Sequence, residues 1–222
     1  MKKNSFRGRC IVCFLLIGGI FTVIGCGSNP KIHTPAESVK TWEAALQYLT
    51  DGNKRFVGNN GITRNTNKKD RDVLTKDGQK PFAVIITCAD SRVAPEIYFD
   101  QKLGDIFVIR NAGNITDATV LGSIEYAVEH LHSPLVVVVG HSKCGAVTGA
   151  LSADGHFPHN LQTIIKTISG NISGISELDE AIKKNINSTV DRIKENEIVK
   201  EENAKVIGAH YNIETGVVTF FE

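Results

Sequence analysis

Residues 82–92 read FAVIITCADSR, and residues 135–144 read LVVVVGHSKC. Each stretch opens with a short apolar run, rich in β-branched side chains, which is typical of a strand buried on both faces of a parallel sheet. Each run then gives way to polar side chains and a cysteine. Because open parallel sheets bind ligands beyond the carboxyl ends of their strands, we expect the functional site where these two runs end.

Comparable runs at 106–109, 206–210 and 217–221 predict three further strands. The last two are joined by a turn that contains Gly216, which indicates an antiparallel hairpin at the C-terminus. Helical periodicity separates the runs, and it covers residues 39–58, 119–130, 144–151 and 176–200, with a short helical piece near 70–74. The pattern predicts an α/β fold: about four parallel strands and an antiparallel C-terminal strand, flanked by helices.

The composition suits one globular domain with a substantial core. The chain has 222 residues, of which 41% are hydrophobic, so extensive disorder is not expected. Lys and Arg total 25 against 24 Asp and Glu, and a chain with so little positive excess is a poor candidate for binding nucleic acid. We therefore expect no nucleic-acid partner.

The N-terminal segment has the features of a bacterial lipoprotein signal peptide. Its first residues carry four basic side chains and no acidic one, and residues 10–24 form an apolar run that is short for a membrane-spanning helix. The run ends at Gly25-Cys26, which resembles the lipoprotein cleavage box. We expect a signal peptide over 1–25, lipidation of Cys26, a tether over 26–38 and a single catalytic domain over 39–222.

This organisation predicts an exported lipoprotein of a bacterium, anchored to a membrane and located in the periplasm or on the outer face. An ordinary signal peptide or an uncleaved anchor is the alternative. Cys10 and Cys13 fall within the apolar run, where we expect them to serve as apolar side chains. If Cys26 is acylated, the mature domain keeps only Cys88 and Cys144 as further cysteines.

Cys88, His141 and Cys144 form a set of ligands that suits zinc. Three protein ligands leave a fourth position for water, which is the arrangement of a catalytic rather than a structural zinc site. A disulfide between the two cysteines is the alternative in an oxidising compartment. Asp90 could accept a hydrogen bond from a zinc-bound water or ligate the metal itself, and Arg92 would favour the charged carboxylate and hold it away from the metal.

Four segments resemble the β-class carbonic anhydrases: CADSRV at 88–93, RNAGN at 110–114, GSIEYA at 122–127 and GHSKCGA at 140–146. The resemblance extends from about residue 42 to the C-terminus. It implies one zinc ion per chain, bound by Cys88, His141 and Cys144, and a functional pair formed by Asp90 and Arg92.

The resemblance also implies which subtype the chain follows. Members with a bicarbonate-binding regulatory pocket have Trp three residues before the first ligand, where this chain has Ile85. The plant-like, open-site subtype has Gln nine residues before it, which is Gln79 here. In that subtype Phe107, Ala112 and Tyr126 would line the CO₂ cleft.

In the family this cleft lies at a dimer interface, and the helix expected at 39–57 embraces the neighbour. The implied activity is reversible hydration of CO₂ to bicarbonate and a proton by zinc-bound hydroxide, in a homodimer or a dimer-based higher oligomer. Three alternatives stay open: hydrolysis of CS₂ or COS on the same fold, a thiol-redox lipoprotein that uses Cys88 and Cys144, and a non-catalytic interaction module.

Overall fold

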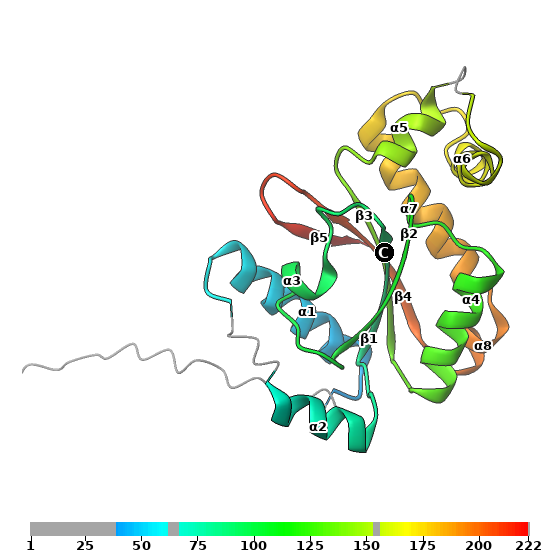
Figure 1. Cartoon of the computed structure of the whole chain (residues 1–222). Coiled ribbons are helices and arrows are strands. Elements are labelled where there is room, and N and C mark those ends of the chain that lie inside the picture. Colours follow the sequence, from blue (N-terminus) through cyan, green and yellow to red (C-terminus); the bar gives the residue numbers. More distant parts are fainter. Residues whose placement is uncertain (1–38, 62–66, 153–155, 222) are drawn as a thin grey trace, which may run out of the picture. The chain divides into compact units, whose positions relative to one another are not determined.

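A five-stranded sheet forms the centre of the computed structural model, and helices cover both of its faces (Figure 1). The structure describes residues 39–61, 67–152 and 156–221. The predicted signal peptide at 1–25, and the tether at 26–38 with Cys26, lie outside the described residues. Among those that are described, no helix is both long enough and apolar enough to span a bilayer.

The strand order is β2-β1-β3-β4-β5. The first four strands are parallel, and β5 runs antiparallel to β4, so the predicted α/β fold is confirmed. The strands are β1 (Ala83–Cys88), β2 (Ile106–Asn111), β3 (Leu135–His141), β4 (Lys205–Tyr211) and β5 (Val218–Phe221). Every residue of β1 and β3 is buried, which explains why both read as continuous apolar runs.

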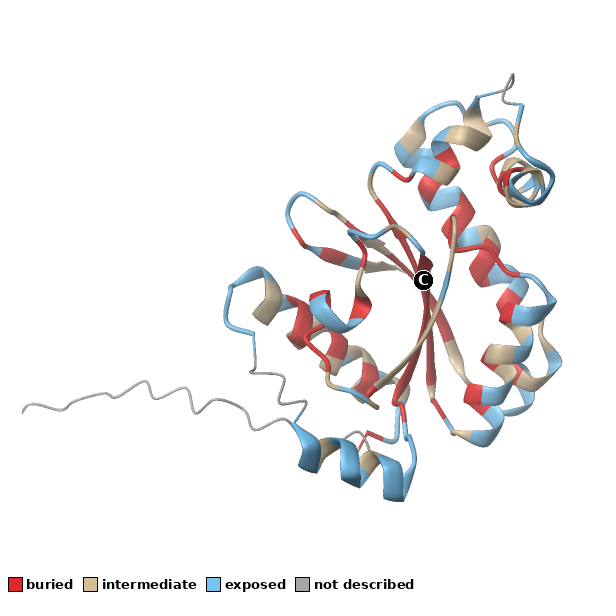
Figure 2. Ribbon diagram, in the orientation of Figure 1, coloured by how far each residue is buried: buried red, intermediate tan, exposed pale blue. Residues whose placement is uncertain are grey.

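Alternating side chains of the central strands supply two apolar clusters, one on each face of the sheet. Ile85 points into a cluster with Leu49 of α1 (Trp42–Val57), and Ile86 points into the opposite one with Ile186 of α7 (Leu178–Lys194). Figure 2 shows the consequence, since the central strands β1 and β3 are buried throughout, the edge strand β2 is only partly buried, and the helices that cover the sheet are buried on the sides that face it. The remaining helices are α2 (Lys68–Asp77), α3 (Pro95–Tyr98), α4 (Ala118–Glu125), α5 (Gly145–Leu151), α6 (His159–Asn171) and α8 (Glu197–Glu201).

The helix predicted across residues 176–200 is in fact two helices, and that prediction was wrong. Helix α7 ends at Lys194, and Asn196 caps α8 by accepting a hydrogen bond from the Val199 N–H at 3.1 Å. Asn favours a cap over a helix interior because its side chain competes for backbone hydrogen bonds. The structure also adds α3 and α6, which the periodicity did not reveal, and α4 continues into a π-helical turn at Tyr126–His130.

A buried amide on α1 ties the N-terminal helix to the end of the chain. Asn53 donates to the carbonyls of Tyr98, at 3.0 Å, and Gly216, at 2.8 Å. Its side-chain oxygen accepts from the Val218 N–H at 2.9 Å. The amide nitrogen and the carbonyl oxygen of the Asn53 side chain are thus both hydrogen-bonded to backbone groups. Asn53 therefore fixes α1 against α3 and the terminal hairpin.

We therefore expect Asn53→Ala to lower the free energy of unfolding by roughly 2–4 kcal/mol, because it leaves buried backbone groups without partners. Urea denaturation of the two proteins measures the difference. Gln47→Ala, on the exposed face of the same helix, is the matched control and should change stability by less than about 0.5 kcal/mol. Equal effects of the two substitutions would contradict this role for Asn53.

Candidate metal centre

The carboxyl ends of β1 and β3 bring the three predicted ligands together. Cys88 is the last residue of β1, His141 is the last residue of β3, and Cys144 directly precedes α5. Because β1 and β3 are parallel neighbours, these ends meet at one edge of the sheet. The ligand atoms all lie within 4.8 Å of one another, and all three residues are buried.

The turn between His141 and Cys144 is held by the end of β4. Lys143 adopts a left-handed conformation with φ of 56°, which reverses the chain between the two ligands. The Ser142 N–H donates to the Tyr211 carbonyl at 3.0 Å, and the Ser142 hydroxyl accepts from the Ile213 N–H at 3.0 Å. A single short turn therefore presents both an imidazole and a thiol.

The His141 ring is oriented as a metal ligand. Its Nδ1 lies 3.0 Å from the Ser142 carbonyl oxygen, and since that oxygen can only accept, Nδ1 carries the proton. Nε2 therefore keeps its lone pair, and it is buried without a hydrogen-bond partner among the described residues. A buried acceptor of this kind beside two sulfur atoms fits a metal ion, and the donor set of two thiols and one imidazole suits zinc.

The two neighbouring thiols shift each other's pKa in opposite directions. The Cys144 thiol, followed by smaller contributions from His141 and backbone N–H groups, lowers the pKa of Cys88 to about 4 against the opposing effect of burial. One backbone donor is the Gly113 N–H, 3.4 Å from the Cys88 Sγ. The same contact, together with burial, raises the pKa of Cys144. Both cysteines are free thiols rather than a disulfide, and a cation would allow both to ionise.

Asp90 and Arg92 form a forked ion pair beside the cluster. Arg92 Nε donates to Asp90 Oδ1 at 2.9 Å, and Arg92 Nη2 donates to Oδ2 at 2.7 Å. These hydrogen bonds are the main reason why the pKa of Asp90 lies well below its usual range. Asp90 Oδ2 is 4.0 Å from His141 Nε2, so an ionised carboxylate borders the position that the three ligands share.

Arg110 is a residue of the site whose role the sequence reasoning missed. Its Nε donates to the Cys88 carbonyl at 3.3 Å, and its Nη2 donates to the Asp90 carbonyl at 2.8 Å. Arg110 lies on the neighbouring strand β2, and its two hydrogen bonds fix the backbone on both sides of Ala89. The segment RNAGN marked the position, but only the pairing of β1 with β2 shows what Arg110 contacts.

The predicted cleft residues do not all lie near the ligands within one chain. Ala112 directly follows β2, next to the Gly113 that contacts Cys88. Phe107 pairs with Val84 rather than with Cys88, so it lies about 13 Å along the strand from the ligand end of the sheet. Its ring centroid is 6.3 Å from that of the exposed Tyr126. Gln79 precedes β1 and is exposed, also toward the amino end of the strands.

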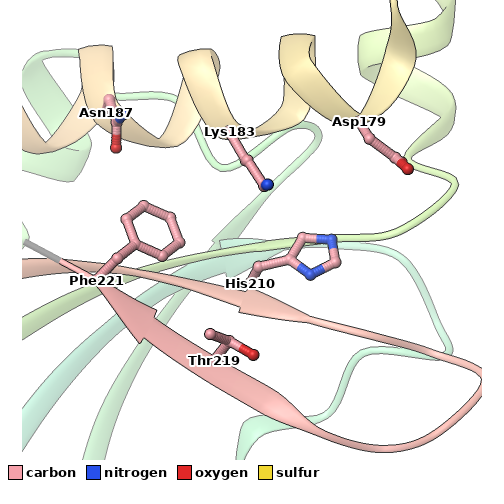
Figure 3. Close-up of a pocket in the computed structure, with 6 residues that line it drawn as sticks. All are labelled: Asp179, Lys183, Asn187, His210, Thr219 and Phe221. Carbon is pink, nitrogen blue, oxygen red and sulfur yellow. The ribbon is translucent and has the colours of Figure 1, made fainter.

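A separate cavity of about 570 Å³ lies between α7 and the terminal hairpin (Figure 3). Its lining residues are Asp179, Lys183, Asn187, His210, Thr219 and Phe221. None of them is a predicted ligand or cleft residue. The cavity is therefore distinct from the Cys88 cluster.

The sheet and the cluster at its edge define an α/β protein built around a metal site, and comparisons with known proteins identify its family. The family model for carbonic anhydrase matches residues 83–218. Carbonic anhydrase 2 of Mycobacterium tuberculosis is 46% identical over 155 residues, covering 66% of this chain and 74% of that protein. The carbonic anhydrase of Mycolicibacterium smegmatis is 44% identical over 159 residues, covering 68% of this chain and 77% of that protein.

Solved structures agree with this assignment. A tetrameric β-carbonic anhydrase from Sordaria macrospora superposes with a TM-score of 0.62 at 28% identity, covering 80% of this chain and 96% of that chain. The Coccomyxa β-carbonic anhydrase has a TM-score of 0.61 at 29% identity, covering 69% of this chain and 78% of that chain. The chain belongs to the carbonic anhydrase family, and its fold is that of the β class.

The Asp90–Arg92 pair leads to a test of the electrostatics of the site. We expect Arg92→Ala to raise the pKa of Asp90 toward the ordinary aspartate value of about 3.9, because the main donor to the carboxylate is lost. NMR titration of the Asp90 carboxyl in both proteins measures the shift. An unchanged Asp90 pKa would contradict the assignment of Arg92 as its principal partner.

The same shift predicts how the stability of the wild type depends on pH. A carboxyl whose pKa is lower in the folded chain stabilises the fold above its unfolded pKa, and this contribution is lost as the pH falls through the folded value. The wild type should therefore be more stable than Arg92→Ala near about pH 6, and the difference should shrink in acid below about pH 4. Urea denaturation at both pH values measures it.

Proposed function

We propose that this protein catalyses the reversible hydration of CO₂ to bicarbonate and a proton, at one zinc ion per chain held by Cys88, His141 and Cys144. The observation that carries the proposal is the buried cluster of two thiols and one imidazole, with their ligand atoms within 4.8 Å of one another. Membership of the carbonic anhydrase family supports the reaction, since the relatives described above carry that name.

The roles of the side chains follow from the geometry of the cluster. When bound, zinc would make water acidic enough to serve as a nucleophile at neutral pH. Asp90 accepts a hydrogen bond from the attacking water and orients its oxygen toward the carbon of CO₂, and Arg92 keeps that carboxylate ionised and in place. The oxygen of water forms a bond to carbon, one C=O bond becomes a C–O⁻ bond, and the proton leaves to solvent.

The substrate cleft requires a second copy of the chain in this proposal. Gln79, Phe107 and Tyr126 lie toward the amino end of the sheet, whereas the ligands lie at its carboxyl end. The exposed Tyr126 ring beside Phe107 is available to a neighbouring protomer. We therefore propose a homodimer or dimer-based oligomer, in which these residues face the partner's ligands and Ala112 completes the apolar wall. The tetrameric relative from Sordaria macrospora is consistent with such an assembly.

The alternatives explain less of the site. A thiol-redox protein would need Cys88 and Cys144 but has no use for the orientation of His141 or for the Asp90–Arg92 fork. A non-catalytic module would not need an ionised carboxylate beside the ligands. Hydrolysis of CS₂ or COS would use the same residues, and the carbonic anhydrase names of the relatives favour CO₂.

The first test is metal content together with CO₂ hydration, on protein that begins at about residue 30. We expect one zinc per chain in the wild type, measured by elemental analysis, and hydration activity that a strong chelator abolishes. Cys144→Ser should lose most of the zinc because a serine hydroxyl is a poor zinc ligand. Thr148→Ser, one turn further along α5, is the control and should keep both its zinc and its hydration activity. Full zinc retention by Cys144→Ser would rule out this ligand set.

The second test concerns Arg92. Without its fork, the Asp90 carboxylate is free to turn toward the ligands and to compete with water for the same position. We expect hydration by Arg92→Ala to fall at least about tenfold while zinc stays bound, because all three ligands remain. Lys76→Ala, which removes an exposed positive charge on α2, is the control and should retain wild-type activity.

A double substitution separates a joint role of the two residues from two independent roles. The loss of activity in the Arg92→Ala, Asp90→Asn protein should be smaller than the loss obtained by multiplying the fold losses of the two single variants, because the two residues act as one unit. Wild-type hydration by zinc-loaded Arg92→Ala would rule out the pair as part of the catalytic machinery. The site would then rest on the metal ligands alone.

We also propose that the enzyme is a lipoprotein anchored through Cys26 on the outer side of a bacterial membrane. The basic residues at the start of the chain, the apolar run at 10–24 and the cysteine that follows it support this proposal. Lipid on Cys26, with a polar tether to about residue 38, would hold the catalytic domain near the bilayer without burying it.

Substitution of the lipidated residue tests the anchor in the full-length chain. Cys26→Ser should either remain unprocessed or appear in the soluble extracytoplasmic fraction, whereas the wild type should partition with membranes as a shorter, lipid-modified form. Fractionation followed by mass spectrometry of the N-terminus distinguishes these states. A Cys26→Ser protein that is still processed and membrane-bound would exclude lipidation at this residue.

A further inference from the structure

The loop that follows β2 brings a backbone N–H to one of the metal-binding sulfur atoms. The Gly113 N–H donates to the Cys88 Sγ at 3.4 Å. Gly113 has φ of 78°, and a Cβ at this position would lie 2.5 Å from the Cδ1 of Ile168 on α6. The position therefore requires glycine both for its backbone conformation and because α6 packs directly against it.

One side of this loop is closed by Asn111, the last residue of β2. Asn111 donates from Nδ2 to the Ile115 carbonyl at 2.8 Å, and its Oδ1 accepts from the Ile115 N–H at 3.0 Å. Asn114, between them, also adopts a left-handed conformation with φ of 46°. These bonds hold the ends of the loop together but do not reach the Gly113 peptide groups.

The other side of the loop is held by two asparagines from distant helices. Asn185 of α7 donates from Nδ2 to the Gly113 carbonyl at 2.8 Å. Asn171, the last residue of α6, donates from its Nδ2 to the Asn185 Oδ1 at 2.9 Å. Because the Gly113 carbonyl can only accept, the Nδ2 of Asn185 must face it. The Oδ1 of Asn185 then faces Asn171 and accepts the hydrogen bond from its Nδ2.

The burial of Asn185 argues that this chain of hydrogen bonds has a purpose beyond packing. Asn185 is 1% exposed, and it lies beside Ile186 on the face of α7 that covers the sheet. An amide at such a position costs desolvation energy that an apolar side chain would not. Thr189, one turn further along α7, is equally buried, and its hydroxyl has no hydrogen-bond partner among the described residues, so it offers an internal comparison.

We infer that Asn185 is a positioning residue for the metal ligand Cys88, acting through Gly113 and itself oriented by Asn171. The inference rests on the proposed function, in which Cys88 binds zinc as a thiolate. Holding the Gly113 carbonyl fixes the backbone of that residue and with it the direction of the N–H that faces the sulfur. The chain of bonds thus runs from the end of α6 through α7 to the loop after β2, and from there to the last residue of β1.

The experiment uses zinc-loaded protein and two readouts other than activity. One is the rate at which zinc passes to an excess of a chromogenic chelator, and the other is the thiolate-to-metal charge-transfer band of the protein loaded with Co²⁺. In Asn185→Ala the Gly113 peptide loses the bond that holds its N–H toward the Cys88 sulfur. We therefore expect zinc release to be about tenfold faster and the band to shift, since loss of the groups that orient a ligand typically weakens a metal site by about 10- to 100-fold. Thr189→Ala, the same truncation at an equally buried position of the same helix, should match the wild type in both readouts.

A second variant separates positioning from general loss of packing. Among the described residues, the side-chain amide of Asn171 donates a hydrogen bond to Asn185 but none to Gly113 or Cys88, so its direct hydrogen-bonding link to the loop runs through Asn185. Asn171→Ala should therefore speed zinc release by a smaller factor. The double variant should release zinc at the rate of Asn185→Ala alone, because the two residues belong to one chain of bonds.

The outcomes are distinguishable. Folded, zinc-loaded Asn185→Ala with wild-type release and an unshifted Co²⁺ band would overturn the inference while leaving the proposed function intact. A wild type that takes up no zinc would instead contradict the proposed function. If Asn185→Ala does not fold, Asn171→Ala decides the matter, since unchanged zinc release in that variant would overturn the inference.

Discussion

The parallel pairing of β1 with β3 is the constraint on which the rest of the site depends. It places the last residues of the two strands, Cys88 and His141, at one edge of the sheet, and the turn after β3 then adds Cys144. An antiparallel pairing would have put the two strand ends at opposite edges. Because both strands are buried along their whole length, their register is fixed by the packing on both faces, and so is the separation of the ligands.

These groups bring several negative charges close together when they are ionised, and the surrounding residues partly compensate for the repulsion. Two thiols that must both ionise lie next to each other in a buried position, and an ionised Asp90 lies nearby. Backbone N–H groups and the guanidinium of Arg92 face the negative side of this arrangement. A divalent cation would complete the balance, which is why the donor set by itself points to a metal enzyme.

The proposed reaction uses a substrate cleft that lies between two chains. The ligands, the Asp90–Arg92 pair and Ala112 gather at the carboxyl ends of the strands, and Phe107 with Tyr126 lies about 13 Å away along the sheet. Such a division is expected when a cleft forms between protomers, because each chain then presents its metal end to one part of the partner and its aromatic side chains to another. Under the proposed dimer, folding of the domain and assembly of the cleft would be separate events.

The fold class could be predicted from the sequence alone, and so could the clustering of Cys88, His141 and Cys144 at one edge of the sheet. Continuous runs of β-branched residues indicate strands that are buried on both faces. Polar residues directly after two such runs indicate the carboxyl ends of parallel strands, where ligands bind. The boundary between α7 and α8 was missed because the apolar period continues through Asn196, although its side chain caps the second helix. Helix α6 was also missed, although Leu161, Ile164, Ile165 and Ile168 recur at helical spacing.

The hydrogen-bond partners of each site residue depend on tertiary packing and could not be predicted from local patterns. The contacts of Arg110 with Cys88 and Asp90 depend on the register of β1 against β2, which no local pattern encodes. The link from Asn185 to Gly113 spans 72 positions, and it exists because α7 crosses the sheet where the loop after β2 emerges. Periodicity reports which face of an element is buried, whereas a hydrogen bond between distant elements depends on how they pack, and that is settled by the fold as a whole.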